Sequence, residues 1–107
     1  MTCNLLLTNV SQEDRRFYLQ LNNGTSVSVL IDDQSDEYRS SGGSFGLLST
    51  ENGGFLVNTL VPGIPLKASV KFGSIPDTVS GIRLLRIDAY SGQSDIKVDF
   101  RDLPLTR

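Results

Sequence analysis

The clearest structural pattern of this chain runs through Leu60-Val61-Pro62-Gly63-Ile64-Pro65-Leu66-Lys67-Ala68-Ser69-Val70-Lys71-Phe72. From Leu66 onward, apolar residues alternate with lysine or serine. That period of two places apolar side chains on one face of a strand and polar ones on the other. Pro62 has a fixed φ and Gly63 a permissive backbone, which favours a turn just before the alternation. The stretch therefore predicts a half-buried strand over Leu66–Phe72 that is entered through a turn.

The same period recurs along the chain and predicts further strands. One pair of these strands is predicted to form a hairpin around Asn22-Asn23-Gly24, because Asn-Gly between two alternating runs favours a two-residue turn. Val27, Val29 and Ile31 form the expected return strand, with Ser26, Ser28 and Leu30 on its other face. The remaining predicted strands or short β segments lie at residues 5–8, 17–21, 38–39, 45–50, 55–58 and 96–101.

Three other segments carry specific expectations. Leu5–Thr8 is apolar without alternation, which is typical of a strand covered on both faces or placed at a sheet centre. Ser40–Ser44 contains two glycines and three serines and predicts a flexible loop. Ser74–Gly81 predicts a loop that crosses between strands.

Residues Ile82–Ala89 fit two patterns. Ile82, Leu85 and Ala89 have helical spacing, whereas Leu85, Ile87 and Ala89 also alternate with Arg86 and Asp88. Glycines flank the segment at positions 81 and 92, and they weaken a helix more than they weaken a turn between strands. The strand is therefore favoured over the helix.

About seven to nine short strands separated by turns, with no convincing helix, predict an all-β fold. An antiparallel β-sandwich of immunoglobulin-like type is favoured over a small barrel, because the strands are uneven and the loops are long. The 107 residues show no internal repeat and no linker, so one domain over residues 1–107 is expected.

The composition disfavours several classes of partner. A net charge of −2 and scattered basic residues disfavour nucleic acid, and no apolar run is long enough for membrane insertion. Aromatic residues make up 7% of the chain and tryptophan is absent, which argues against a stacking platform for bases or sugars. The expected module is thus soluble, with a protein as the expected partner and an oligomeric state that the sequence leaves open.

Several short motifs fall in a familiar order between Leu5 and Leu85. They are Leu7-Thr8-Asn9-Val10-Ser11, Ile31-Asp32-Asp33 followed by Tyr38, Leu60-Val61-Pro62-Gly63, Val70-Lys71-Phe72 and Ile75-Pro76. In this order the chain resembles the bacterial immunoglobulin-like β-sandwich domains of unknown function that occur on lipoproteins and other exported proteins. The resemblance implies an accessory or adhesive role, no catalytic site and an extracytoplasmic location. No signal peptide or lipobox is visible at Met1-Thr2-Cys3-Asn4, so the location follows from the resemblance alone.

One group of residues is a candidate metal site. Asp32, Asp33, Asp36 and Glu37 lie within six residues on an acidic turn. Calcium prefers several carboxylate and carbonyl oxygens gathered on a flexible turn, although the spacing differs from the twelve-residue helix-loop-helix pattern. The same acids on a solvated turn would bind nothing, and this is the alternative reading.

The sequence offers little for catalysis. Histidine is absent, so no histidine can activate a serine or cysteine nucleophile, and Cys3 has no evident activating partner. Asp88 and Asp99 could act as an acid–base pair, but pairing with Arg86 or Lys97 across strands is the commoner arrangement. No enzyme activity and no cofactor other than calcium is therefore expected.

The function that follows is a non-enzymatic binding or structural accessory module, acting through loops or a sheet edge. The candidate surfaces are Gln34–Ser44 and Glu51–Phe55. A calcium- or carbohydrate-binding module and a subunit of a self-assembling surface or phage structure are the alternatives. The expected partner-binding residues are Ser41, Gly42, Gly43, Asn52, Gly53 and Phe55.

Overall fold

Ten antiparallel strands and their connecting turns make up the computed structural model, which describes residues 1–92 and 94–104. The strands are β1 (Thr2–Leu7), β2 (Arg15–Asn23), β3 (Ser26–Val27), β4 (Val29–Asp32), β5 (Glu37–Phe45), β6 (Leu48–Thr50), β7 (Gly54–Leu60), β8 (Leu66–Phe72), β9 (Gly81–Ser91) and β10 (Ser94–Pro104). The all-β prediction is confirmed, with more strands than the seven to nine expected. No helix long and apolar enough to span a bilayer occurs in the described part of the chain.

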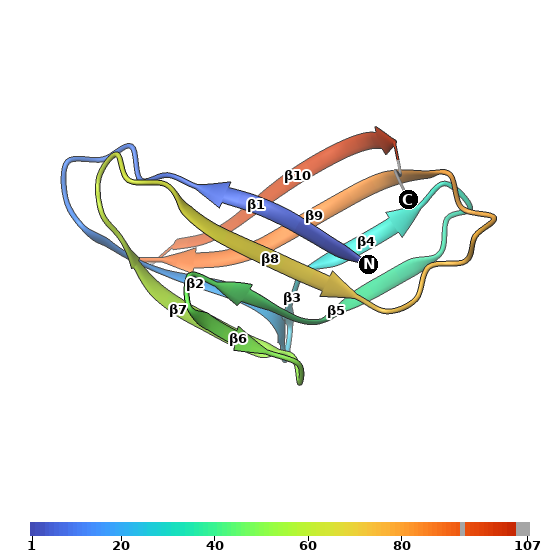
Figure 1. Cartoon of the computed structure of the whole chain (residues 1–107), viewed down its shortest axis with the longest axis horizontal. Helices are drawn as coiled ribbons and strands as arrows, with labels where there is room; N and C mark the ends of the chain where they lie inside the picture. The colour runs from blue at the N-terminus through green and yellow to red at the C-terminus, as the bar shows by residue number, and fades with distance from the viewer. Residues whose placement is uncertain (93, 105–107) are drawn as a thin grey trace.

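The strands form a sheet that curls into a half-barrel. Its order is β1-β8-β5-β4-β9-β2-β3, with β6 paired to β5, β7 to β2 and β10 to β9. In Figure 1, β1 and β8 lie in front of β9 and β10, so the two arms of the curl face each other across the core. The immunoglobulin-like sandwich stays a prediction, because one curled sheet connects both arms.

Strand β5 makes the bend between the two arms. Its first residues pair with β4, and from Ser40 onward it pairs with β8 instead, after an irregularity in register between Ser40 and Gly42. The flexible loop predicted at Ser40–Ser44 is therefore wrong. A methyl group at Gly43 would collide with the carbonyl oxygen of Ser69, and one at Gly42 with that of Thr50. The glycines thus allow close packing of β5 against its neighbours.

Strand β8 has the predicted bounds, Leu66–Phe72, and buries Ala68, Val70 and Phe72. The first strand differs from its prediction. Among the described residues β1 pairs only with β8, so it is an edge strand rather than a central one. Its side chains alternate after all: Cys3 and Leu5 are partly buried against the core, whereas Leu6 is exposed.

The predicted hairpin forms, but its return strand is divided. Asn22 pairs with Val27 around a turn in which Gly24 has a φ of 64°. After Ser28 the chain leaves β2, and β4 pairs with β9 and β5. Leu30 and Asp32 lie on the fully buried face of β4. Val29 and Ile31 lie on its other face and are only partly buried.

Residues Ile82–Ala89 form a strand, as favoured over the helix. They lie in β9, which pairs with β10 along one side and with β4 and then β2 along the other. The last predicted strand lies within β10. The core is formed by side chains from both arms of the curl, and these are Leu19, Leu21, Leu30, Phe45, Leu56, Leu60, Ala68, Val70, Phe72, Ile82, Leu85 and Ile87.

Candidate functional site

The acidic turn is organised around Asp32, whose side chain is 0% exposed. One carboxylate oxygen accepts the backbone N–H groups of Gln34 and Asp36, each at 2.9 Å. The other accepts the Tyr38 hydroxyl at 2.9 Å. Asp32 therefore holds the turn in place, and three hydrogen bonds already occupy most of its acceptor positions.

Burial and hydrogen bonding act in opposite directions on Asp32. Burial works to raise its pKa, but the three hydrogen bonds from Asp36, Tyr38 and Gln34 outweigh burial and leave the pKa below its ordinary value. The hydrogen bond to Asp32 also raises the pKa of Tyr38. The pair is thus a carboxylate and a neutral phenol at neutral pH.

The other three acids of the turn point elsewhere. One oxygen of Asp33 accepts the Ser80 hydroxyl at 2.8 Å, and Glu37 lies 3.6 Å from Arg39, measured between Oε1 and Nε. Asp36 is exposed. In the part of the chain that the structure describes, no three metal-ligating side chains come together, and calcium binding at this turn stays a prediction.

The predicted partner-binding residues come from two segments that the fold places side by side. The Gly53 N–H donates to the carbonyl oxygen of Ser41 at 3.1 Å. Gly42, Gly43 and Gly53 are buried, whereas Ser41, Asn52 and Phe55 are exposed. The set remains a predicted binding surface, and only the exposed members have side chains that solvent reaches.

The carboxylates considered for acid–base chemistry carry ion pairs across β9 and β10. Arg86 donates from Nε and Nη2 to both oxygens of Asp99, at 2.7 and 2.8 Å. This pair raises the pKa of Arg86 and lowers that of Asp99. The Nζ of Lys97 lies 3.8 Å from Asp88. The expected cross-strand pairing of these four residues is confirmed.

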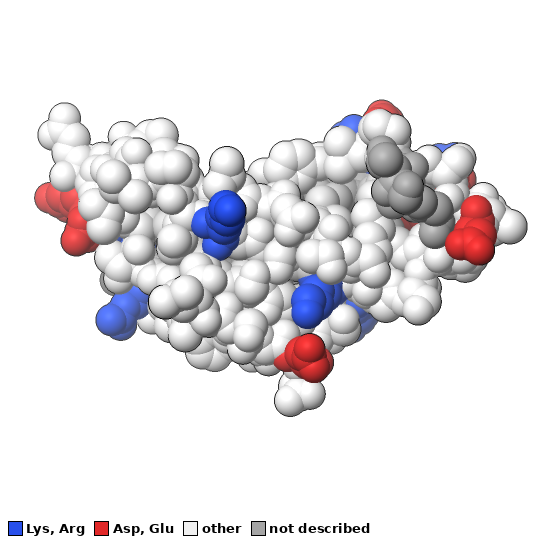
Figure 2. All heavy atoms as spheres, viewed as in Figure 1, with Lys and Arg blue, Asp and Glu red and all other residues white. Residues whose placement is uncertain are grey.

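An apolar groove of about 730 Å³ lies at one end of the molecule. Its rim carries four exposed apolar side chains, Leu47, Leu48, Val61 and Ile64, which we call the apolar end. Leu47 lies in the turn between β5 and β6 and is fully exposed, and Ile64 is 60% exposed. Lys67 is the one charged residue of the lining. In Figure 2, which views the face with β1 and β8, charged side chains are few.

A second groove, of about 310 Å³, lies between the edge strands β1 and β10. Cys3 and Leu5 of β1 line one side, and Phe100 and Leu103 of β10 line the other. Burial raises the pKa of the Cys3 thiol and outweighs the opposing charge of the amino terminus, so the thiol is protonated at neutral pH. Val98 and Phe100 of β10 are exposed, although they share the strand face that packs inward.

Sequence reasoning missed two features. The apolar end combines the turn at Leu47 with the turn at Ile64, which lie far apart in the sequence. Tyr18, Phe55 and Tyr90 form the second feature, since three strands bring their rings together. Each of these tyrosines occupies a polar-face position of an alternating strand, and this is the sequence signal that was available.

No protein-family model, curated protein or solved structure matches this chain. The resemblance to bacterial immunoglobulin-like domains stays a prediction, and the functional argument rests on the geometry described above.

Proposed function

We propose that this protein is a non-enzymatic binding module whose apolar end takes an apolar segment of a partner protein. The observation that carries the proposal is the groove with Leu47, Leu48, Val61 and Ile64 exposed around it. Large contiguous apolar patches are rare on proteins without a partner and commonly mark interaction sites. Folding does not account for these side chains, because they contribute little to the core.

Turn chemistry strengthens this argument. Gly46 has a φ of 62°, so it provides the conformation that the β5–β6 turn needs. Position 47 has no requirement for an apolar residue, and turns usually place polar residues there. Ile64 likewise follows the turn residues Pro62 and Gly63, and most of its side chain is exposed. Leucine and isoleucine at these positions are explained by contact with a partner.

Charge narrows the chemistry of that partner. Lys67 is the only charged side chain in the groove lining, and no ion pair to it is seen within the described residues. A partner segment that combines apolar side chains with an aspartate or glutamate would bury its apolar atoms in the groove and pair its carboxylate with Lys67. We therefore infer an apolar, acidic peptide segment as the occupant.

The test is a selection of displayed random peptides on the wild-type protein, with the double variant Leu47→Asp/Ile64→Asp as counter-target. We expect enriched peptides that are apolar and carry at least one acidic residue. Their affinity should fall about tenfold or more in Leu47→Asp, since a carboxylate would be desolvated in an apolar contact. Lys67→Gln should weaken the acidic peptides more than their amidated counterparts.

Val10→Asp is the matched control, because Val10 is 95% exposed and does not line the groove. All variants should melt within a few degrees of the wild type, since surface substitutions change stability by about 0.5 kcal/mol or less. Peptides that bind Leu47→Asp as well as wild type, or no enrichment at all, would reject the proposal.

Self-assembly is a second candidate, favoured by the groove between β1 and β10. Each of these strands pairs with one neighbour in the described sheet, and Val98 and Phe100 are exposed beside the groove. A strand from a second copy could pair with either edge and cover these side chains. Light scattering over a concentration series should then show growth that Val98→Lys suppresses, and a persistent monomer would exclude it.

A further inference from the structure

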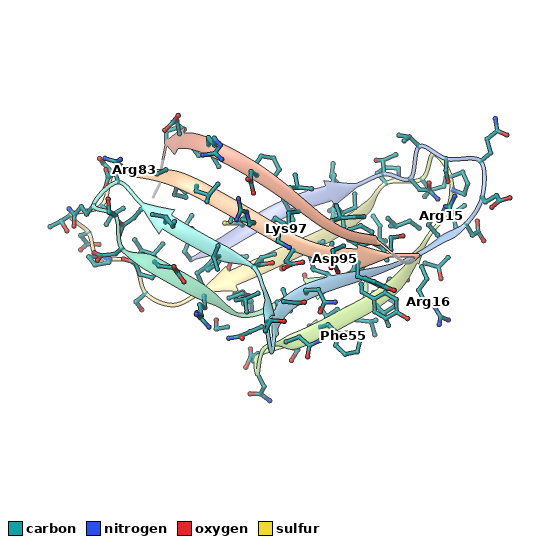
Figure 3. All side chains as sticks on the ribbon, turned by 180° about the vertical axis from the view of Figure 1, so that it is seen from behind. Arg15, Arg16, Phe55, Arg83, Asp95 and Lys97 are labelled. Carbon is teal, nitrogen blue, oxygen red and sulfur yellow. The ribbon has the colours of Figure 1, made fainter. Side chains whose placement is uncertain are left out.

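Three aromatic rings form a patch on the outer face of β2, β7 and β9. The rings of Tyr18 and Tyr90 lie 5.7 Å apart at 72°, and those of Tyr18 and Phe55 lie 5.8 Å apart at 45°. Phe55 is 47% exposed. We call these three residues the aromatic patch; Figure 3 shows Phe55 on this side of the molecule. The patch lies outside the groove of the apolar end.

Hydrogen-bonding side chains continue the same face from the patch toward the β10 edge. Cross-strand register places Gln20 opposite Phe55 on one side and opposite Asp88 on the other. It also places Asp95 opposite Tyr90, and Lys97 opposite Asp88. Asp95 and Lys97 lie on the side viewed in Figure 3. Donors and acceptors therefore alternate directly beside the rings.

Asp88 is the informative member of this group. Its side chain is only 6% exposed, yet its closest cation, the Nζ of Lys97, lies 3.8 Å away, beyond hydrogen-bond distance. No side-chain or backbone hydrogen bond to this carboxylate is seen within the described residues. On the same two strands, Asp99 receives two hydrogen bonds from Arg86, at 2.7 and 2.8 Å. The Asp88 carboxylate therefore has acceptor positions that no protein donor in the described residues uses, and the hydroxyl groups of a ligand can donate to them.

The charges of this face select among ligands. Beside the rings, Lys97 pairs with Asp88, and Arg16 and Asp95 add one charge of each sign. Further along β9 and β10, Arg86 and Arg101 lie against Asp99. The charges beside the rings therefore favour neither a polyanion nor a polycation. The rings offer apolar faces with polar edges, to which flat ligands with C–H groups bind. A ligand for this face must therefore be neutral, partly apolar and rich in hydroxyl groups.

The low aromatic content argued against a stacking platform for sugars, but the fold gathers three of the eight aromatic residues on one face. We propose that the aromatic patch and its polar neighbours bind a neutral saccharide. The C–H faces of successive sugar rings lie on Phe55 and Tyr90, while a hydroxyl group donates to Asp88 and another accepts from Lys97. Because the face is open, it takes a stretch of polysaccharide chain along the sheet. A small sugar alone would be poorly enclosed there. This saccharide site is separate from the groove of the apolar end, so saccharide binding and peptide binding are independent of each other.

Affinity electrophoresis tests the proposal. The intact protein is run through native gels that contain neutral polysaccharides, namely xylan, mixed-linkage β-glucan, galactomannan and starch, and through a gel without polysaccharide. We expect at least one of them to retard the wild type. Tyrosine fluorescence should change on titration with oligosaccharides of the same type, because two of the three tyrosines lie in the patch and tryptophan is absent.

Four variants separate a site from an incidental surface. Phe55→Ala and Asp88→Asn should each weaken binding about tenfold, and Tyr90→Ala should weaken it to a similar degree. Leu47→Asp, which alters the apolar end, should leave retardation unchanged. Melting curves verify that each variant is folded, and Phe55→Ala is the most informative since its ring is half exposed.

The proposal is overturned if none of these neutral polysaccharides retards the protein, or if folded Phe55→Ala and Asp88→Asn are retarded like the wild type. Retardation by acidic polysaccharides alone would also overturn it, because the balanced charge of the face would then be irrelevant. Loss of peptide binding in Leu47→Asp has no bearing on this result, so the two proposals fail independently.

Discussion

At the scale of single residues, Asp32 is a predicted calcium ligand whose carboxylate accepts the hydrogen bonds that hold its own turn together. Its carboxylate accepts hydrogen bonds from two backbone N–H groups and from Tyr38 inside the turn. The hydrogen bonds to the charged form keep its pKa below the ordinary value of 3.8 despite burial. The folded chain therefore binds a proton at Asp32 less readily than the unfolded chain does.

This difference predicts how stability responds to acid. The stabilising contribution of Asp32 is complete above its unfolded pKa, near 4, and is lost as the pH falls toward the lowered folded pKa. We expect Asp32→Asn to be less stable at neutral pH, with a melting temperature lower by several degrees. We also expect a shallower loss of stability below about pH 4 than in wild type. Urea unfolding across this pH range measures both.

Asp14→Asn is the matched control, since Asp14 is exposed on a loop. Asp99 also has a lowered pKa, so some acid sensitivity should persist in Asp32→Asn. An unchanged pH dependence in Asp32→Asn would contradict the role assigned to the carboxylate.

At the scale of elements, Ser28 joins three strands where the return strand divides. Its hydroxyl donates to the carbonyl oxygen of Gln20 at 2.7 Å and accepts the N–H of Asp88 at 3.0 Å. Its own N–H donates to Leu21. The side chain thus replaces the sheet hydrogen bonds that are lost where β2 separates from β9 and β4 begins.

We predict that Ser28→Ala lowers the free energy of unfolding by about 1–3 kcal/mol, because the N–H of Asp88 becomes a buried donor without a partner. Hydrogen exchange at that N–H should become faster than in wild type. Ser74→Ala, in an exposed loop, is the control. Protection of the Asp88 N–H that does not change in Ser28→Ala would refute this bridging role.

At the scale of the whole molecule, β5 couples the two arms of the curl. It pairs with β4 in one arm and with β8 in the other, and its buried Phe45 contacts Phe17 of β2 with ring centres 5.9 Å apart. The core combines side chains from both arms. Neither arm has a complete core of its own, which favours a single cooperative transition.

We therefore expect urea unfolding followed by tyrosine fluorescence to coincide with unfolding followed by far-ultraviolet circular dichroism. Phe45→Ala should reduce the free energy of unfolding by about 3–5 kcal/mol, in both signals together. Two separate transitions in the wild type would show that the arms unfold independently and would contradict the coupling by β5.

The alternation of apolar and polar residues predicted most of the strands, but it did not predict the candidate binding sites. Leu66–Phe72 and the turn at Gly24 formed as predicted, because side-chain period and turn chemistry are local properties. The segment Ser40–Ser44 was misread, because its glycines are required by the neighbouring carbonyl groups of Ser69 and Thr50, which the sequence does not place there. Leu5–Thr8 was misplaced for a similar reason, since edge position depends on pairing partners.

The sequence by itself determined an antiparallel all-β chain, the faces of most strands and the absence of histidine chemistry. Only the tertiary structure decided that Asp32 is buried, that the turns at Leu47 and Ile64 share one groove, and that Tyr18, Phe55 and Tyr90 meet on one face. The physical reason is the range of the interactions. A strand's period is set by its own residues, whereas a binding surface is assembled from strands whose pairing depends on contacts across the whole chain.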